Sequence, residues 1–114
     1  MGDISAHFNR AEFACKCGCG KNTIDAGVVA ALENVRTYFD TPVNIISANR
    51  CKTHNEAVGG APSSQHLLSR AADIQVVGVE PSDVYIYLDS RHEGGLGGYS
   101  TFTHVDTRNM KARW

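Results

Sequence analysis

Two short segments in the second half of the chain carry side chains that can bind a metal ion and activate water. They supply two histidines, His66 and His104, and two carboxylates, Asp73 and Asp106. Two histidines and one carboxylate are a ligand set of catalytic zinc sites, in which a fourth position stays open to water. The residue types therefore predict one zinc ion per chain, bound by His66, Asp73 and His104, and a hydrolytic activity.

Asp73 is the residue that is hardest to explain without a metal. It stands between Ala72 and Ile74 in an apolar stretch, and a carboxylate in such surroundings is costly unless it is paired or bound to a cation. The histidines taken singly are less informative, because one histidine in a small domain is more often a surface residue or a hydrogen-bonded core residue. The metal site therefore depends on whether the fold brings the three side chains together.

The composition excludes several other classes of function. The chain has 114 residues, 42% of them hydrophobic, and a formal net charge of -1, which suits a single domain over residues 1–114. Its scattered basic residues give no electrostatic footprint for nucleic acid or for an anionic membrane. No apolar stretch has the length of a membrane helix. The first residues lack a secretory pattern, so we expect synthesis in the cytosol.

The elements that must position these residues alternate between helices and strands. Apolar residues at helical spacing over residues 26–39 predict the main helix, with Asp25 as its N-cap. A short helix is predicted after Asn9, further helices at 53–58 and 81–89, strands at 43–47, 72–77 and 102–107, a flexible turn at 94–98 and a tail at 108–114. The predicted fold class is α+β, with about three helices beside a small, mostly antiparallel sheet.

Strand geometry puts the candidate ligands on compatible faces. Side chains alternate along a strand, so His104 and Asp106 share one face of the last strand. If the central strand is its neighbour, Asp73 lies beside His104. His66, in the loop just upstream of that strand, then folds back to complete the site.

The four cysteines, Cys15, Cys17, Cys19 and Cys51, have no single interpretation. A disulfide from the Cys/Gly loop to Cys51 and four reduced thiols agree equally well with the sequence. A second zinc site is less well supported, because Cys-x-Cys-x-Cys lacks the two-to-four-residue spacing of zinc fingers. We expect none of these states to supply the chemistry.

A combination of motifs extends from about Phe8 to the end of the chain. Ser64-x-His66-x6-Asp73 and His104-x-Asp106 occur together with characteristic residues at 13–20, 47–51, 54–55, 58–61, 94–99 and 102–103. This combination resembles the zinc D-Ala-D-Ala carboxypeptidase family, and within it the small single-domain phage and bacterial members. The wider relatives include vancomycin-resistance dipeptidases, bacteriophage endolysin peptidases, murein endopeptidases and the hedgehog signalling domain. The resemblance implies their α+β fold.

The resemblance also implies a peptidase that acts on the D-amino-acid peptides of bacterial cell wall, with the three zinc ligands named above. Arg50 matches a basic position that contacts substrate, where a guanidinium suits a terminal carboxylate or a developing oxyanion. The alternative for Arg50 is a salt bridge within its loop. Ser64 and Gln65 border the metal and are expected to bind the peptide. The expected partner is a peptidoglycan stem peptide, bound by a monomer that reaches the wall by phage release or another export route.

Two departures from the family's motifs affect the site. Ser69 replaces the usual glycine of the first motif and is expected to affect only the local turn. Many relatives carry an acid three positions before the last zinc histidine, or a histidine two positions before it, and here these positions are Thr101 and Phe102. Neither accepts a proton, so Asp106 is predicted to be the general base. The alternatives are that Asp106 orients a zinc ligand, or that Glu93 is the base.

The predicted function is a zinc metallopeptidase of peptidoglycan, acting as a carboxypeptidase or an endopeptidase, for example in phage lysis. The alternative is a binding or phage structural module that keeps the fold and the zinc but has little catalytic activity. The missing upstream acid supports this alternative. A redox or zinc-finger module built on the cysteines is weakly supported, because their spacing suits neither.

Overall fold

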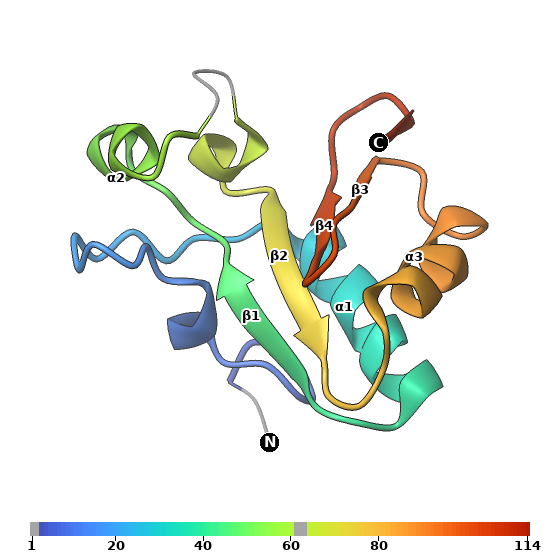
Figure 1. Cartoon of the computed structure of the whole chain (residues 1–114). Coiled ribbons are helices and arrows are strands. Elements are labelled where there is room, and N and C mark those ends of the chain that lie inside the picture. Colours follow the sequence, from blue (N-terminus) through green and yellow to red (C-terminus); the bar gives the residue numbers. More distant parts are fainter. Residues whose placement is uncertain (1–2, 61–63) are drawn as a thin grey trace.

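The computed structural model describes residues 3–60 and 64–114 of the chain (Figure 1). In this part of the chain, helices and strands largely alternate, as the sequence predicts. The helices are α1 (Ala26–Phe39), α2 (Lys52–Ala57), α3 (Pro81–Asp89) and the short 3-10 helices η1 (Arg10–Phe13) and η2 (Gln65–Leu68). The strands are β1 (Val43–Ser47), β2 (Ala71–Val76), β3 (Gly95–Gly98), β4 (Thr103–Asp106) and β5 (Ala112–Arg113).

The strands form one sheet in the order β1-β2-β4-β3-β5. The β1–β2, β2–β4 and β3–β4 pairs are antiparallel, and only the short β5 runs parallel to its neighbour β3. This arrangement confirms the predicted α+β class with a mostly antiparallel sheet. The register pairs Asp73 of β2 directly with His104 of β4, so the predicted neighbourhood of these two residues is confirmed.

The two faces of the sheet have different tasks. Alternate residues of β2, namely Ala72, Ile74 and Val76, join the hydrophobic core with buried residues of α1 and α3. In Figure 1, α1 lies behind the sheet, while α2 and η2 lie at the end where β2 begins. The opposite face of β2 and β4 carries Asp73 and His104. In the described residues, no helix is both long and apolar enough to cross a membrane.

The glycine-rich segment is the main correction to the predicted elements. Residues 94–98 were predicted to be a flexible turn, but Gly95–Gly98 is strand β3, inserted between β4 and β5. A Cβ atom at Gly95 would collide with the Asp106 carboxylate, and one at Gly97 would collide with the Trp114 indole. The glycines are therefore required by close packing on the open face of the sheet. Helix and strand propensity could not reveal this requirement.

Candidate metal centre

The three predicted ligands meet on the open face of the sheet. Asp73 comes from β2, His104 from the paired position of β4, and His66 from η2, which directly precedes β2. The Nε2 atom of His66 lies 3.3 Å from Asp73 Oδ2, and Nδ1 of His104 lies 2.8 Å from Asp73 Oδ1. One donor atom from each residue lies within 4.8 Å of the other two. The fold thus assembles a set of two imidazoles and one carboxylate.

Hydrogen bonds to the backbone orient His66. Ser64 caps η2, where its Oγ accepts the backbone N–H of His66 at 3.2 Å. The Nδ1 atom of His66 lies 2.6 Å from the carbonyl oxygen of Ala48, to which it donates. This bond leaves Nε2 as the ring nitrogen that faces Asp73. Metal-binding histidines usually have their second ring nitrogen fixed in this way.

A buried carboxylate orients His104. The Nε2 atom of His104 lies 2.8 Å from Oδ2 of Asp106, whose side chain is 0% exposed. Asp106 also accepts hydrogen bonds from the backbone N–H of Gly95 at 3.0 Å and of Arg108 at 3.1 Å. The Arg108 guanidinium donates to both carboxylate oxygens, at 2.9 and 2.7 Å. Both oxygens of Asp106 are therefore fully engaged.

The ionisation of the two carboxylates agrees with a site for a cation. Burial raises the pKa of Asp73, but hydrogen bonds from His104 and His66 outweigh burial and lower this pKa to about 2. Burial lowers the pKa of His104, whereas its bonds to Asp106 and Asp73 raise it above its ordinary value. Burial also raises the pKa of Asp106, which His104 and Arg108 bring well below its usual range. Both carboxylates are thus ionised at neutral pH.

The distances fit a tetrahedral zinc ion. Zinc bonds of about 2.0–2.2 Å place neighbouring ligand atoms of a tetrahedron roughly 3.3–3.6 Å apart. The 3.3 Å between His66 Nε2 and Asp73 Oδ2 lies in this range, whereas the 2.8 Å between His104 Nδ1 and Asp73 Oδ1 is a hydrogen-bond length that would widen on binding. Neutral imidazoles and an ionised carboxylate are also the donors that zinc prefers. His66, Asp73 and His104 would therefore hold the ion with little rearrangement.

The ligands line a cleft of about 680 Å³, whose walls include residues from four segments. Trp114 lies beside His104, with ring centroids 5.2 Å apart, and its Nε1 donates to the Tyr99 hydroxyl at 2.8 Å. Tyr99 in turn stacks on Phe102. The cleft is the side of the site from which a fourth ligand or a substrate can approach.

Arg50 lies in this cleft, as the sequence predicts. Its Nη2 atom lies 3.6 Å from Asp73 Oδ2, and its Nη1 donates to Asn55 Oδ1 at 3.3 Å. The buried Nε atom has no hydrogen-bond partner among the described residues. Arg50 therefore does form an ion pair, but with the predicted metal ligand Asp73 and not with a residue of its own loop. Arg50 keeps donor capacity at the edge of the metal site.

The other predicted substrate residues, Ser64 and Gln65, also line the cleft. Ser64 Oγ is occupied by the turn described above, and Gln65 Oε1 accepts from Arg70 Nε at 2.5 Å. Their contact with a peptide stays a prediction. Ser69, which replaces the family's glycine, adopts a left-handed backbone with φ 59 and donates its hydroxyl to Asn49 Oδ1 at 2.7 Å. The turn is thus kept, with side-chain hydrogen bonds in place of glycine's freedom.

The general base stays a prediction, and the geometry does not favour Asp106 in that role. A base must reach the proton that it removes, whereas both Asp106 oxygens are enclosed beneath His104. This position favours the alternative in which Asp106 orients His104. Glu93 lines another pocket with His92 and Lys111. Among the described residues that line the metal cleft, Asp73 is the only carboxylate.

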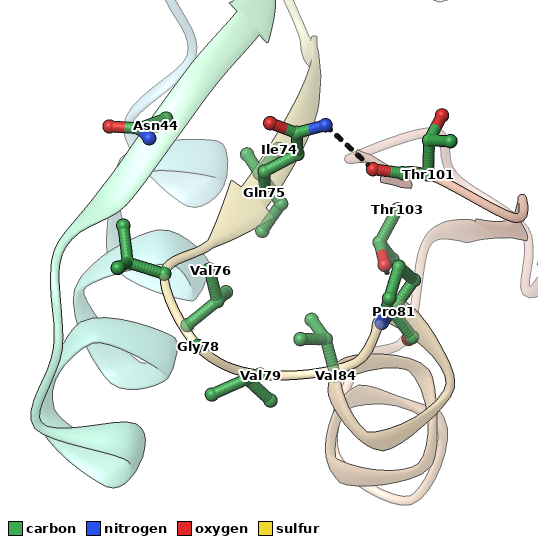
Figure 2. Close-up of a pocket in the computed structure, with 11 residues that line it drawn as sticks. Asn44, Ile74, Gln75, Val76, Gly78, Val79, Pro81, Val84, Thr101 and Thr103 are labelled. Atoms are coloured by element: carbon green, nitrogen blue, oxygen red, sulfur yellow. Dashed lines mark hydrogen bonds between the residues drawn. The ribbon is translucent and has the colours of Figure 1, made fainter.

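A second pocket, of about 270 Å³, lies toward the far end of β2 (Figure 2). Its lining includes Ile74, Val84 and Thr103, and Gln75 donates to the carbonyl of Thr101 at 2.8 Å across it. None of the side chains that line it is ionisable. Thr101, at the position where many relatives carry an acid, thus lies in this pocket and not among the residues of the metal cleft.

Sequence reasoning missed Arg108 and Trp114, which belong to the stretch predicted to be a tail. Arg108 neutralises Asp106, and its guanidinium carbon lies 4.9 Å from the centre of the Trp114 ring. The pairing of β5 with β3 returns the chain to the cleft. The one signal in the sequence was the Asp-x-Arg spacing after the last strand, which puts opposite charges on one face of extended chain.

Comparison with known proteins agrees with this geometry. The profile of a protein family described as Peptidase M15 matches residues 6–106, a segment that includes the three candidate ligands and Arg50. No curated protein matches the chain. The match extends over most of the chain and confirms the resemblance carried by the motifs. The chain belongs to the M15 family of zinc D-Ala-D-Ala carboxypeptidase-like peptidases.

Proposed function

We propose that the protein is a zinc metallopeptidase that hydrolyses an amide bond next to a D-amino acid in peptidoglycan peptides, as a carboxypeptidase or an endopeptidase. The observation that carries this proposal is the convergence of His66, Asp73 and His104 within 4.8 Å at the wall of an open cleft. Membership of a zinc-dependent peptidase family supports it. The hydrogen bonds that orient His66 and His104 are further evidence, because metal-binding histidines typically have such bonds.

The charge of the cleft favours an anionic substrate. Arg50 and Arg108 line it, and a bound divalent cation would add two further positive charges. The carboxylates of Asp73 and Asp106 supply two negative charges. With the ion bound, the net charge of these groups would be positive near the point where a substrate carbonyl has to approach. Peptidoglycan stem peptides carry several carboxylates, including the one at their D-alanine terminus. A cleft of this sign would attract them and disfavour cationic peptides.

The chain's own residues would divide the work as follows. When bound, zinc supplies Lewis acidity toward a carbonyl oxygen and toward water. The carbonyl of Ala48 orients the imidazole of His66, and Asp106 orients that of His104, for binding the ion. Arg50 is placed to bind a substrate carboxylate or to stabilise the oxyanion as it develops. Asp106 acts through His104 as a positioning residue.

One observation favours a second candidate function. The described residues of the cleft offer no carboxylate besides the ligand Asp73, so the group that accepts a proton from water is not evident. A zinc-bearing module that binds peptidoglycan peptides without cleaving them fits the same geometry. The two candidates share the metal centre and the cleft, and they differ only in turnover.

Incubation of the zinc-loaded protein with defined muropeptides, followed by mass spectrometry, tests the proposal. We expect cleavage of a D-Ala-D-Ala-terminated pentapeptide or of a cross-linked dimer, and loss of that cleavage with a chelator and in His66→Ala. The matched control is His7→Ala, since His7 is bonded to Glu33 away from the cleft. A folded protein that binds both zinc and these peptides but leaves every substrate intact would instead establish the binding module.

A further inference from the structure

The four cysteines come together in space although they are spread along the chain. The Sγ atoms of Cys15 and Cys17 lie 3.4 Å apart, those of Cys17 and Cys51 3.5 Å apart, and those of Cys15 and Cys51 4.0 Å apart. The Sγ atom of Cys19 lies within 4.8 Å of the other three. We propose that this cysteine cluster, Cys15, Cys17, Cys19 and Cys51, binds a second zinc ion in a closed structural site.

The separations match those of a tetrahedral thiolate site. Zinc–sulfur bonds of about 2.3 Å put the sulfur atoms of a tetrahedron roughly 3.8 Å apart. The three shortest separations, 3.4, 3.5 and 4.0 Å, lie on both sides of this value. Four protein sulfurs complete the coordination of zinc, and this number is typical of structural sites rather than catalytic ones.

The arrangement does not have the form of two disulfide bonds. A disulfide joins two sulfur atoms at about 2.05 Å and separates that pair from its neighbours. Here Cys15, Cys17 and Cys51 form a nearly even triangle of free thiols. With the sulfur of Cys19, all four atoms lie within 4.8 Å of one another, which is close enough for them to share a single ion.

The loop geometry explains how closely spaced cysteines converge. Gly18 and Gly20 have φ values of 82° and 91°, a left-handed conformation that glycine adopts without strain. They reverse the chain, and Cys15 N–H closes the loop by donating to the carbonyl of Lys21 at 2.7 Å. The sequence argument against zinc was the short Cys-x-Cys-x-Cys spacing. In the folded loop, the sulfur atoms of these closely spaced cysteines nevertheless lie within 4.8 Å of one another. The short spacing is therefore no obstacle to a shared zinc ion.

Backbone donors point at the sulfur atoms. The backbone N–H of Cys51 donates to Cys15 Sγ at 3.4 Å, and that of His54 donates to Cys51 Sγ at 3.4 Å. Such bonds stabilise sulfur as an anion. On binding, each of the four thiols would lose its proton to solvent and form one Zn–S bond, with no change of oxidation state.

The cysteine cluster adjoins the cleft at Arg50. Cys51 directly follows Arg50, and Lys21, beside the loop, donates from Nζ to the carbonyls of Arg50 at 3.2 Å and of Leu67 at 2.6 Å. A zinc ion that ties Cys51 to the 15–19 loop would thus fix the backbone on which Arg50 stands. The site's role is structural, and it does not depend on whether the cleft catalyses hydrolysis.

Metal analysis of the full chain, purified with zinc under reducing conditions, tests this proposal. We expect two zinc ions per chain in the wild type, one in the double variant Cys17→Ser/Cys51→Ser, and one in His66→Ala. Lys16→Ala, in the same loop but without a lost thiol, is the matched control and should keep both ions. One zinc in the wild type, retained in the cysteine variant, would overturn the proposal, as would iron in place of the second zinc.

Cobalt replacement in the wild type keeps the test independent of how well the cysteine variant folds. Cobalt bound by four thiolates gives strong thiolate-to-metal charge-transfer absorption, which we expect in the wild type and undiminished in His66→Ala. All four thiols should resist alkylation until a chelator is added. Absence of this absorption, with immediate alkylation of the reduced thiols or with disulfides found by mass spectrometry, would show that no ion is bound there.

Discussion

The candidate metal centre and the cysteine cluster are two donor sets built on different parts of the fold. The ligands of the metal centre are buried residues on paired strands and an adjoining 3-10 helix, and they line a cleft. The cysteine cluster lies on loops, with Cys17 and Cys19 exposed. One set has nitrogen and oxygen donors with an approach from the cleft, and the other has four sulfur donors that lie within 4.8 Å of one another. The metal centre is thus accessible to a substrate through the cleft, whereas the proposed site in the cysteine cluster has only a structural role.

The groups that hydrogen-bond to the ligands also differ between the two sites. Behind His104 lies the buried carboxylate of Asp106, which is paired with the partly exposed guanidinium of Arg108. Behind the cysteine sulfurs lie only neutral backbone N–H groups. A substitution behind the metal centre therefore removes a buried charge, whereas the cysteine cluster has no such dependence.

Replacing Asp106 with Asn should give the largest difference between the two sites. The change leaves the partly exposed Arg108 guanidinium without its anion, and losing this charged hydrogen-bond partner costs about 1–3 kcal/mol of unfolding free energy. Zinc affinity of the metal centre should fall roughly 10–100-fold, because His104 loses its orienting partner, while zinc in the cysteine cluster stays bound. Urea denaturation and competition with a chromogenic chelator measure both effects.

Asp89→Asn is the matched control, because Asp89 pairs with Arg113 at the surface and is half exposed. Its loss should cost less than about 1 kcal/mol. If Asp106→Asn keeps its zinc affinity and loses about 10²–10⁴-fold in rate, Asp106 is the general base instead.

Replacing Arg50 with Lys should have a smaller effect, confined to substrate. Lysine keeps the charge but lacks the two-pronged contact, and the loss of one charged hydrogen bond corresponds to roughly a 10–100-fold lower kcat/KM. Both zinc ions and the melting temperature should stay nearly unchanged. Arg36→Lys is the control, because Arg36 lies on α1, is partly exposed and does not line the cleft. A large drop in melting temperature with normal kinetics would mean that the ion pair with Asp73 is the main role of Arg50.

The smallest expected effect is the pH dependence of stability in the metal-free protein. Asp73 has a pKa lowered to about 2, so its contribution is present above about pH 4 and is lost as the pH falls through 2. His104 has a raised pKa, so its contribution is present below about pH 6.5 and is lost above its folded pKa. Urea midpoints across pH in a chelator should therefore be highest between these limits.

Cysteine thiols are protonated in this acid range, so the cysteine cluster adds nothing to the acid limb. Asp106 and Glu33 also have lowered pKa values and contribute to the same limb. Asp73→Asn should remove the part of that limb that Asp73 contributes. Unchanged urea midpoints between pH 4 and 2 in the wild type would contradict the assigned ion pairs.

The sequence predicts one of these regions far better than the other. Alternation along a strand is enough to put His104 and Asp106 on one face, and an aspartate in an apolar strand indicates a partner. The main helix and the strand at 43–47 follow from simple periodicity, and their predicted bounds agree with the structure. These features are local, or they need only one pairing of neighbouring strands.

What the sequence could not reveal depends on contacts between distant segments. The strand character of Gly95–Gly98 arises from the bulk of Asp106 and Trp114 on the adjoining chain. The return of the last residues to the cleft depends on pairing of β5 with β3. The convergence of Cys51 with a loop more than thirty residues upstream depends on packing of the segment 15–21 beside Arg50 and Cys51.

Trp114 has a consequence for how the cleft can be followed in solution. It is the single tryptophan of the chain, and its ring lies near both the His104 imidazole and the Arg108 guanidinium at the cleft wall. Its fluorescence therefore originates from one known place. A cation that displaces the proton of His104, or a peptide that covers the indole, changes its emission. The protein thus contains a label-free optical reporter of events in its own cleft.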